Sequence, residues 1–286
     1  MYIKFWGVRG SVASGSLDTV KVGGNTTCVE IRCNQELIII DTGTGFHDLG
    51  RALMKQLPVK GTILFSHVHW DHIQGFPHFI PFFTAGNEFR VFGGTSLPIS
   101  VEEIIKQQMN PPCFPVKTDI FDAKISYHDV RPGEVIEGEN YKITLTSLNH
   151  PNGCYAYRID HKDQSLVFAT DCEHYEDKPN QDLIDLSRNT DVLVYDCQYT
   201  DDEYYGLNGE LPRKGHGHST LREGIKVAQA ANANKFVLFH HDPSHNDKVV
   251  QKIEEEARQL FPRSIAAYEG LKIDLSKKRL PNSLFD

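Results

Sequence analysis

The sequence predicts an α+β fold of four layers, αββα, in which two β-sheets pack face to face and helices cover both outer sides. Three observations predict it: strand-like runs outnumber helical ones, the strands follow one another in meanders, and the helices do not alternate strictly with them. The meanders also lead us to expect mostly antiparallel sheets. No linker-like or low-complexity stretch and no solenoid-length repeat interrupts the chain, so we expect a single domain over residues 1–286.

The first third of the chain reads mainly as strands. Runs rich in β-branched and aromatic residues, broken by Gly, Asn or Pro, predict strands over 2–6, 27–32, 37–41 and 62–66. Leu49, Leu53 and Leu57 recur at four-residue spacing and predict an amphipathic helix over 46–57, which Pro58 ends.

The rest of the chain adds strands and helices around one irregular segment. Residues 73–118, rich in Pro, Phe and Gly with one short helix near 101–109, predict an excursion that could wall a site. Further strands are expected over 141–147, 155–160, 166–170, 192–195 and 235–239. Helices are expected over 182–187, 220–233 and 248–261, and a polar loop that contains tyrosines over 199–217.

Composition excludes several classes of protein. Hydrophobic residues make up 40% of the chain, an ordinary globular balance, and the net charge of −8 argues against a broad basic surface for duplex nucleic acid. The longest aliphatic runs fall far short of the ~20 residues that a membrane helix needs. The first residues lead straight into a strand without signal-peptide architecture, and the six cysteines, with no CxxC pair, are typical of free thiols in a reducing compartment. We therefore expect a cytoplasmic protein without a membrane partner.

The most informative motif is a string of histidines directly after the strand over 62–66. It reads Ser66-His67-Val68-His69-Trp70-Asp71-His72 and places four potential metal ligands within six residues at a strand end. Three imidazoles crowded together without a cation would gain no evident stability. The string therefore predicts a metal site.

Three more ligand-type residues occur in the same setting, each just after an expected strand. They are His150, Asp171 and His240. Any one of them could be an ordinary polar residue at a strand end. Together with the histidine string they favour a centre that holds two metal ions.

These ordered motifs, with Gly217-His218-Ser219-Thr220, resemble those of metallo-β-lactamase-fold hydrolases, in the branch of tRNase Z and the small cyclic phosphodiesterases. The resemblance covers nearly the whole chain. It implies that the first metal is held by His67, His69 and His150, that the second is held by Asp71, His72 and His240, and that Asp171 bridges both. His240 and His241 are adjacent, which leaves the last ligand open between them. We favour His240, because it is the first residue beyond the strand.

The residue types agree with this resemblance. Neutral imidazoles suit zinc, and manganese is also possible, while a shared carboxylate fits two ions about 3.5–4 Å apart. Such ions lower the pKa of bound water to about 7 and so supply a hydroxide nucleophile. Asp41, in Ile40-Asp41-Thr42-Gly43, resembles the family's aspartate that orients a ligand imidazole.

A leaving alkoxide also needs a proton. His218 lies at the expected start of the helix over 220–233, where its imidazole could act as general acid. Enzymes resembling tRNase Z pair such a histidine with an acidic residue at the end of an earlier strand; here Asp196 stands where those enzymes have glutamate. The resemblance thus implies His218 and Asp196 as catalytic residues, and we add Asp71 to them.

The substrate is expected to be small. Only 21 positions separate His150 from Asp171, too few for the tRNA-clasping arm that tRNase Z-like enzymes carry there, so RNA processing is disfavoured. Family members without the arm act on cyclic nucleotides or other small diesters, which is our leading hypothesis. Side chains of the 199–217 loop that could stack on a ring or contact phosphate are Tyr199, Tyr204, Tyr205, Arg213 and Lys214.

Two other functions stay open. The same centre could hydrolyse a carboxylic ester, lactone or lactam, a reaction that needs no dedicated acid at position 218. A binding protein that keeps the fold without turnover would be expected to lack some of the ligands, and here all are present. The resemblance also implies a homodimer, with residues 73–118 or 199–217 as candidate contact surfaces.

Overall fold

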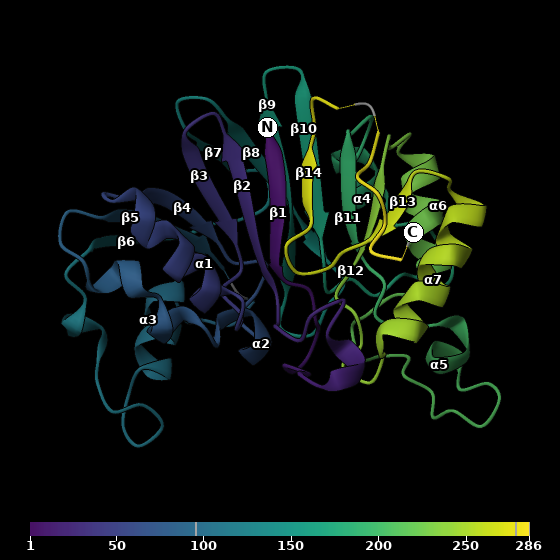
Figure 1. Cartoon of the computed structure of the whole chain (residues 1–286), viewed down its shortest axis with the longest axis horizontal. Helices are drawn as coiled ribbons and strands as arrows, with labels where there is room; N and C mark the ends of the chain where they lie inside the picture. Colours follow the sequence, from purple (N-terminus) through teal and green to yellow (C-terminus); the bar gives the residue numbers. More distant parts are fainter. Residues whose placement is uncertain (95, 278, 286) are drawn as a thin grey trace.

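The computed structural model describes residues 1–94, 96–277 and 279–285, and within these the chain forms two sheets of seven strands each (Figure 1). The first sheet has the order β14 (Lys272–Asp274), β1 (Tyr2–Gly7), β2 (Cys28–Cys33), β3 (Glu36–Ile40), β4 (Lys60–Leu64), β5 (Glu88–Gly93) and β6 (Lys124–Asp129). The second has the order β13 (Ser264–Ala266), β12 (Phe236–Phe239), β11 (Val192–Asp196), β10 (Gln164–Ala169), β9 (Cys154–His161), β8 (Lys142–Leu148) and β7 (Val135–Glu137).

Helices cover both outer sides of this pair of sheets. On the side of the first sheet lie α1 (Phe46–Leu53) and α3 (Val101–Gln108), and on the side of the second lie α4 (Gln181–Leu186), α6 (Leu221–Ala230) and α7 (Asp247–Leu260) (Figure 1). Two short helices, α2 (Trp70–Ile73) and α5 (Asp201–Tyr205), lie at the lower end of the sheets. The expected four-layer αββα fold is confirmed.

The expectation of mostly antiparallel sheets is wrong. In the first sheet the pairings from β14 to β3 are antiparallel and those from β3 to β6 are parallel. The second sheet repeats this pattern, antiparallel from β7 to β10 and parallel from β10 to β13. Parallel neighbours need a crossover connection, and the helices between these strands provide it.

One apolar core fills the space between the sheets and continues under the helices outside the second sheet, and another lies on the outer face of the first sheet. The core between the sheets joins residues of both, as where the rings of Phe5 and Phe239 lie 5.7 Å apart. The outer core is rich in phenylalanine, with Phe46 and Phe79 stacked at 3.8 Å. The segment over 73–118 is therefore less irregular than expected, because Phe76, Phe79 and Phe82 pack against Phe46 of α1 and the segment contains β5.

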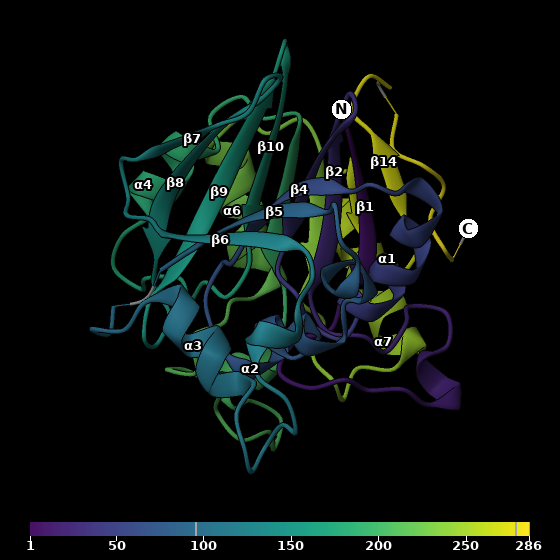
Figure 2. The same cartoon turned by 90° about the vertical axis from the view of Figure 1, so that its left-hand side faces the viewer.

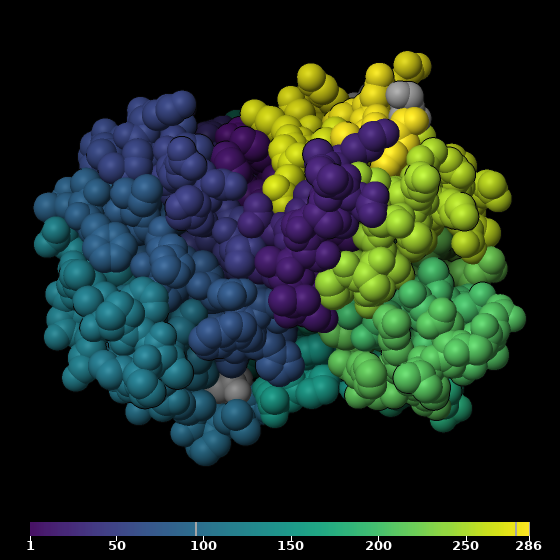
Figure 3. All heavy atoms as spheres, turned by 60° about the horizontal axis from the view of Figure 1, so that its bottom comes forward, coloured from purple at the N-terminus to yellow at the C-terminus, as the bar shows by residue number. Residues whose placement is uncertain are grey.

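The sheets bring several strand ends to one end of the molecule. Figure 2 shows β4–β6 lying across β8–β10, and the residues that follow β4, β8, β10 and β12 meet in one place. Figure 3 views this end, where the purple and blue early segments and the green segment around residue 210 surround a hollow. No helix in the part of the chain that the structure describes is both long and apolar enough to cross a bilayer.

Candidate metal centre

The histidine string forms the first half of the site because of the way β4 ends. β4 ends at Leu64, the chain then bends at Ser66 and His69, and α2 begins at Trp70. Asp71 and His72 lie in this single helical turn, and their side chains meet with Asp71 Oδ2 3.2 Å from His72 Nε2. The His72 carbonyl accepts a hydrogen bond from Thr42 N after β3 (2.7 Å). The string is thus folded back against the end of the neighbouring strand.

One group of imidazoles joins the two sheets. His67 and His69 meet His150, which follows β8, and ligand atoms of the three lie within 4.8 Å of one another. His150 Nε2 is 3.1 Å from His69 Nδ1, and His67 Nε2 is buried without a hydrogen-bond partner. A buried polar nitrogen with no partner is costly, and a metal ion at this point would satisfy it.

A second group lies beside the first. His72 Nε2 is 3.2 Å from His240 Nε2, and Asp71 Oδ2 is 3.2 Å from the former and 3.5 Å from the latter. Donors bound at ~2.0–2.2 Å to one tetrahedral ion lie roughly 3.3 Å from each other. The spacing of these three donor atoms therefore fits one metal ion.

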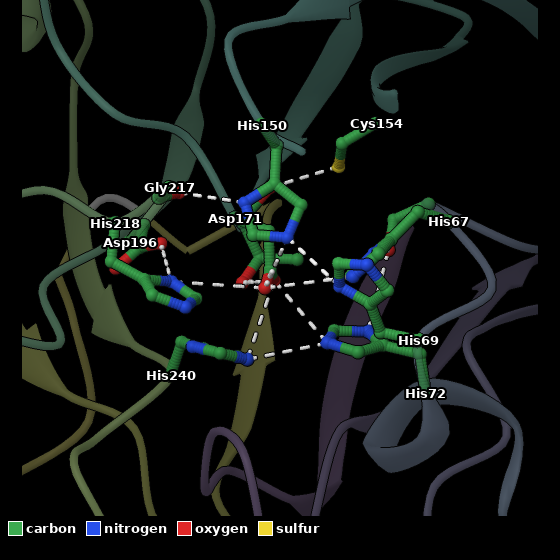
Figure 4. Close-up of polar contacts among 12 residues, drawn as sticks. His67, His69, His72, His150, Cys154, Asp171, Asp196, Gly217, His218 and His240 are labelled. Carbon is green, nitrogen blue, oxygen red and sulfur yellow. Dashed lines mark hydrogen bonds and ion pairs between the residues drawn. The ribbon is translucent and has the colours of Figure 1, made fainter. Parts of the chain in front are cut away.

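Asp171 lies between the two groups and turns one oxygen to each. Its Oδ1 is 3.7 Å from the Nε2 atoms of His67 and His150, and its Oδ2 is 3.3 Å from those of His72 and His240 (Figure 4). This division suits a carboxylate that bridges two ions. The structure thus brings all seven expected residues together.

Adjacent His240 and His241 point to opposite sides. His240 joins the cluster, whereas His241 Nε2 donates to the Ala267 carbonyl at 2.9 Å and is buried away from it. Of the two residues that the sequence left open, the geometry brings His240 to the site.

Three imidazoles of the cluster are hydrogen-bonded through Nδ1, the ring nitrogen that does not face the centre. His72 Nδ1 donates to Asp41 Oδ2, His150 Nδ1 donates to the Gly217 carbonyl, and His240 Nδ1 donates to Gln198 Oε1, each at 2.8 Å. With Nδ1 protonated, each Nε2 keeps its lone pair for the centre. The contact of Asp41 was expected; those of Gly217 and Gln198 were missed, although Gln198 follows a strand end as the ligand-type residues do.

Burial and charge divide the imidazoles into two kinds. Burial lowers the pKa of His67 well below its usual value and also lowers the pKa values of His69 and His150, so these three rings are neutral and ready to bind a cation. Burial opposes protonation of His72 too, but the charges of Asp71, Asp171 and Asp41 outweigh it and raise its pKa well above the usual value. A bound cation would take the place of that proton.

His218 lies beside Asp171 and is paired with Asp196. His218 Nδ1 is 2.9 Å from Asp196 Oδ2 and 3.7 Å from Asp171 Oδ1. Burial disfavours protonation, but the charge and hydrogen bond of Asp196 outweigh it and raise the pKa of His218 to about 9. The Asp196 carboxylate is itself held by the backbone amides of Cys172 and Gln198. The short aspartate therefore reaches the imidazole, in spite of replacing a glutamate.

Comparison with known proteins agrees with this site. The family model described as the beta-lactamase superfamily domain matches residues 36–241, a range that includes every residue of the cluster. The chain belongs to the beta-lactamase superfamily. Membership places it among metal-dependent hydrolases.

Relatives and solved structures extend the likeness beyond that range. The chain is 25% identical to Ribonuclease Z of Acaryochloris marina over 98% of this chain and 99% of the relative. The metallo-beta-lactamase fold protein YhfI from Bacillus subtilis has a TM-score of 0.70 at 18% identity, covering 95% of this chain and 98% of its own. A diphosphatase of the PhnP family has a TM-score of 0.68 at 18% identity, covering 96% and 97%. These structures share the metallo-β-lactamase fold with this chain.

Within this superfamily fold, the 199–217 loop differs from the expectation. It contains α5, and Tyr199 and Tyr204 are buried, so only Tyr205 keeps a half-exposed ring. Arg213 pairs with Asp242 at 2.8 Å, and Lys214 pairs with Glu176. Most of the side chains expected to stack on or contact a substrate therefore have partners within the protein.

Proposed function

We propose that the chain is a binuclear metal-dependent phosphodiesterase that hydrolyses a small phosphodiester, with cyclic nucleotides as the substrate class. The observation that carries this proposal is the division of the two Asp171 oxygens between two groups of donors, with the imidazole of His218 alongside.

The proposed metals are two zinc ions, and the same imidazole and carboxylate donors also suit manganese. One ion is held by His67, His69 and His150, the other by Asp71, His72 and His240, with Asp171 shared. When bound, such a pair supplies a hydroxide nucleophile at neutral pH and polarises a phosphoryl oxygen. Two aspartates balance only two of the four positive charges, so the site attracts a phosphodiester anion.

His218 is proposed to protonate the leaving oxygen. Its Nδ1 is engaged by Asp196, which leaves Nε2 as the nitrogen that can give a proton to the substrate. The alkoxide that leaves a phosphodiester is a poor leaving group and needs this proton. Asp71 is proposed as a further catalytic residue through the second ion, and the hydrogen bond from Ser11 N (2.8 Å) helps to hold its Oδ2 in place.

The proposed substrate size rests on the segment between His150 and Asp171. The strands β9 and β10 pair directly through a tight turn, with His161 opposite Gln164. This hairpin takes up most of the segment and leaves too few residues for an additional arm. The relatives named Ribonuclease Z make RNA processing the second candidate. The tight hairpin and the net charge of −8 favour a small diester instead.

Hydrolysis assays on the metal-loaded protein test this proposal. The panel comprises 3′,5′- and 2′,3′-cyclic nucleotides, bis(p-nitrophenyl) phosphate, a p-nitrophenyl ester, a lactone and a precursor tRNA, each with and without a chelator. We expect chelator-sensitive turnover of a cyclic nucleotide. Turnover of the ester or lactone alone, of the precursor tRNA alone, or of nothing would reject the proposal.

Three further properties belong to the proposal. We expect one domain over residues 1–286, working in the cytoplasm, where the six free cysteines stay reduced.

A homodimer is also expected, since Ile80 and Phe83 on one candidate surface and Leu207 and Leu211 on the other expose apolar side chains. Light scattering of the purified protein tests it; a monomer at micromolar concentration would contradict it.

A further inference from the structure

The side chain of Glu173 connects three segments around the metal centre. Glu173 lies two residues beyond Asp171 and is 9% exposed. Its Oε1 accepts hydrogen bonds from the Tyr204 hydroxyl (2.7 Å) and from Gly215 N (2.6 Å), and its Oε2 accepts one from Gly217 N (3.0 Å). One carboxylate thus holds α5 and the loop that leads to His218.

The backbone of this loop is shaped to receive a carboxylate. Gly215 and Gly217 both have positive φ, +88° and +89°, and their amides turn to the same anion. Alternating backbone amides of this kind form a concavity that binds anions. A side chain is excluded at position 217, because a Cβ there would lie 2.3 Å from His150 Nδ1. The loop therefore passes directly against a proposed metal ligand.

Two groups of the site depend on where this loop lies. The Gly217 carbonyl accepts the hydrogen bond of His150 Nδ1, and the next residue is His218 (Figure 4). The backbone of Glu173 reaches the same region from the other side, since its N–H donates to the Asn149 carbonyl at 2.9 Å. Glu173 contacts neither His150 nor His218 and acts on both through the backbone.

We propose that Glu173 is a positioning residue, which holds His218 at its place for proton transfer and keeps the Gly217 carbonyl against His150. The part that concerns His218 rests on the proposed function; the part that concerns His150 does not. A carboxylate is required because three donors and no acceptor converge on it, and bonds from N–H and O–H groups to a charged acceptor are about twice as strong as those to a neutral one.

The variant E173Q tests this role with little change of shape. An amide has a single oxygen acceptor, and its NH2 group would face a backbone N–H. The matched control is E176Q, the same substitution three residues away at an exposed carboxylate that pairs with Lys214 of the same loop. If E173Q does not fold, Y204F takes its place; it removes one of the three donors and leaves both glycine amides bonded.

Three measurements compare these variants with the unmodified protein. In E173Q we expect amide hydrogen exchange of residues 213–218 to accelerate about tenfold or more, and zinc affinity to fall about 10–100-fold. At saturating zinc, kcat for a cyclic nucleotide should fall at least about tenfold more than kcat for bis(p-nitrophenyl) phosphate, whose leaving group needs no proton. With Y204F we expect the same direction and a smaller size in all three. E176Q should match the unmodified protein.

The outcomes separate positioning from general stability. A merely structural role would lower both kcat values by the same factor, which would overturn the proposal for His218. Exchange and zinc affinity equal to those of E176Q would overturn it for the loop and for His150. If the unmodified protein hydrolyses no diester, the proposed function fails, while exchange and zinc affinity still decide the role of Glu173.

Discussion

Three residues of the centre are held in a backbone conformation that non-glycine residues rarely adopt. Asp41 and His240 directly follow β3 and β12, Asp171 lies two residues after β10, and the three have φ values of +59°, +60° and +56°, respectively. Each such residue costs of order 1–3 kcal/mol, which the surrounding structure must offset. The turn sends each side chain sharply from its strand end toward the others. Their types and places at strand ends could be predicted from the sequence. Gln198 has a similar place but was missed because glutamine is not a typical metal ligand, and Glu173 was missed because its partners are a hydroxyl and two backbone amides.

Replacing His218 tests the proposed acid. H218A should lower kcat for a cyclic nucleotide by about 10²–10⁴-fold, because no other side chain would protonate the leaving alkoxide. Its effect on bis(p-nitrophenyl) phosphate should stay within about threefold. Steady-state kinetics with both substrates check this, and equal losses on both would contradict the role.

The adjacent histidines 240 and 241 provide a matched pair for the proposed ligands. H240A should lower the metal content from two ions to about one per chain, because it removes a donor of the second group. H241A should keep two ions and lose about 1–3 kcal/mol of unfolding free energy, because a buried carbonyl loses its partner. Elemental analysis measures the metal content of both purified variants. Loss of metal in H241A with retention in H240A would show that His241, not His240, is the ligand.

At the scale of elements, the parallel strands β10, β11 and β12 do most to position the second half of the site. Their hydrophobic runs and the helices between them could be read from the sequence. Strands β5, β6, β7, β13 and β14 were not predicted, because they lie in the outer parts of the sheets, where the sequence shows no clear apolar run. The parallel pairing was not predicted, because it depends on which strands lie next to each other after each crossover.

The side chain of Glu203 in α5 makes hydrogen-bonded contacts that contribute to stability in a pH-dependent way. Burial would raise the pKa of Glu203, but the contact with His245 (2.8 Å) and the hydrogen bonds from Thr200 lower it to about 2. A depressed carboxyl pKa stabilises the fold above its unfolded value of about 4.3, and this contribution is lost as the pH falls toward about 2. The substitution E203Q should therefore cost about 1–2 kcal/mol at pH 7, a figure reduced for solvent screening of this half-buried group, and progressively less below pH ~4. Urea unfolding of the metal-free proteins at pH 7 and pH 3 measures this; a constant difference would contradict it.

For the whole molecule, the proposed metals add to the contacts between two sheets that share an apolar core and several hydrogen bonds, such as that from the Tyr157 hydroxyl to the Phe65 carbonyl (2.7 Å). Each donor group takes two residues from the segment after β4 of the first sheet and a third from the second sheet, His150 in one group and His240 in the other. Both sheets repeat the same pattern of antiparallel and parallel pairing (Figure 1). The residues that follow the parallel strands β4, β10 and β12 meet at the metal centre. Metal binding should therefore couple to the folding of both sheets.

Zinc should stabilise the fold as this coupling requires. At a free concentration of 100 times the dissociation constant, one bound ion adds about 2.7 kcal/mol to the unfolding free energy, provided that the unfolded chain does not bind it. Thermal unfolding across a zinc titration, with the chelated protein as reference, measures the effect. A transition temperature independent of zinc would contradict the coupling.

Anomalous X-ray diffraction from crystals of the zinc-loaded protein, recorded on both sides of the zinc edge, tests the two-metal centre most directly. The account predicts two anomalous peaks about 3.5–4 Å apart with the Asp171 carboxylate between them, one beside His67, His69 and His150 and the other beside Asp71, His72 and His240. A single peak, or zinc bound away from these residues, would contradict it.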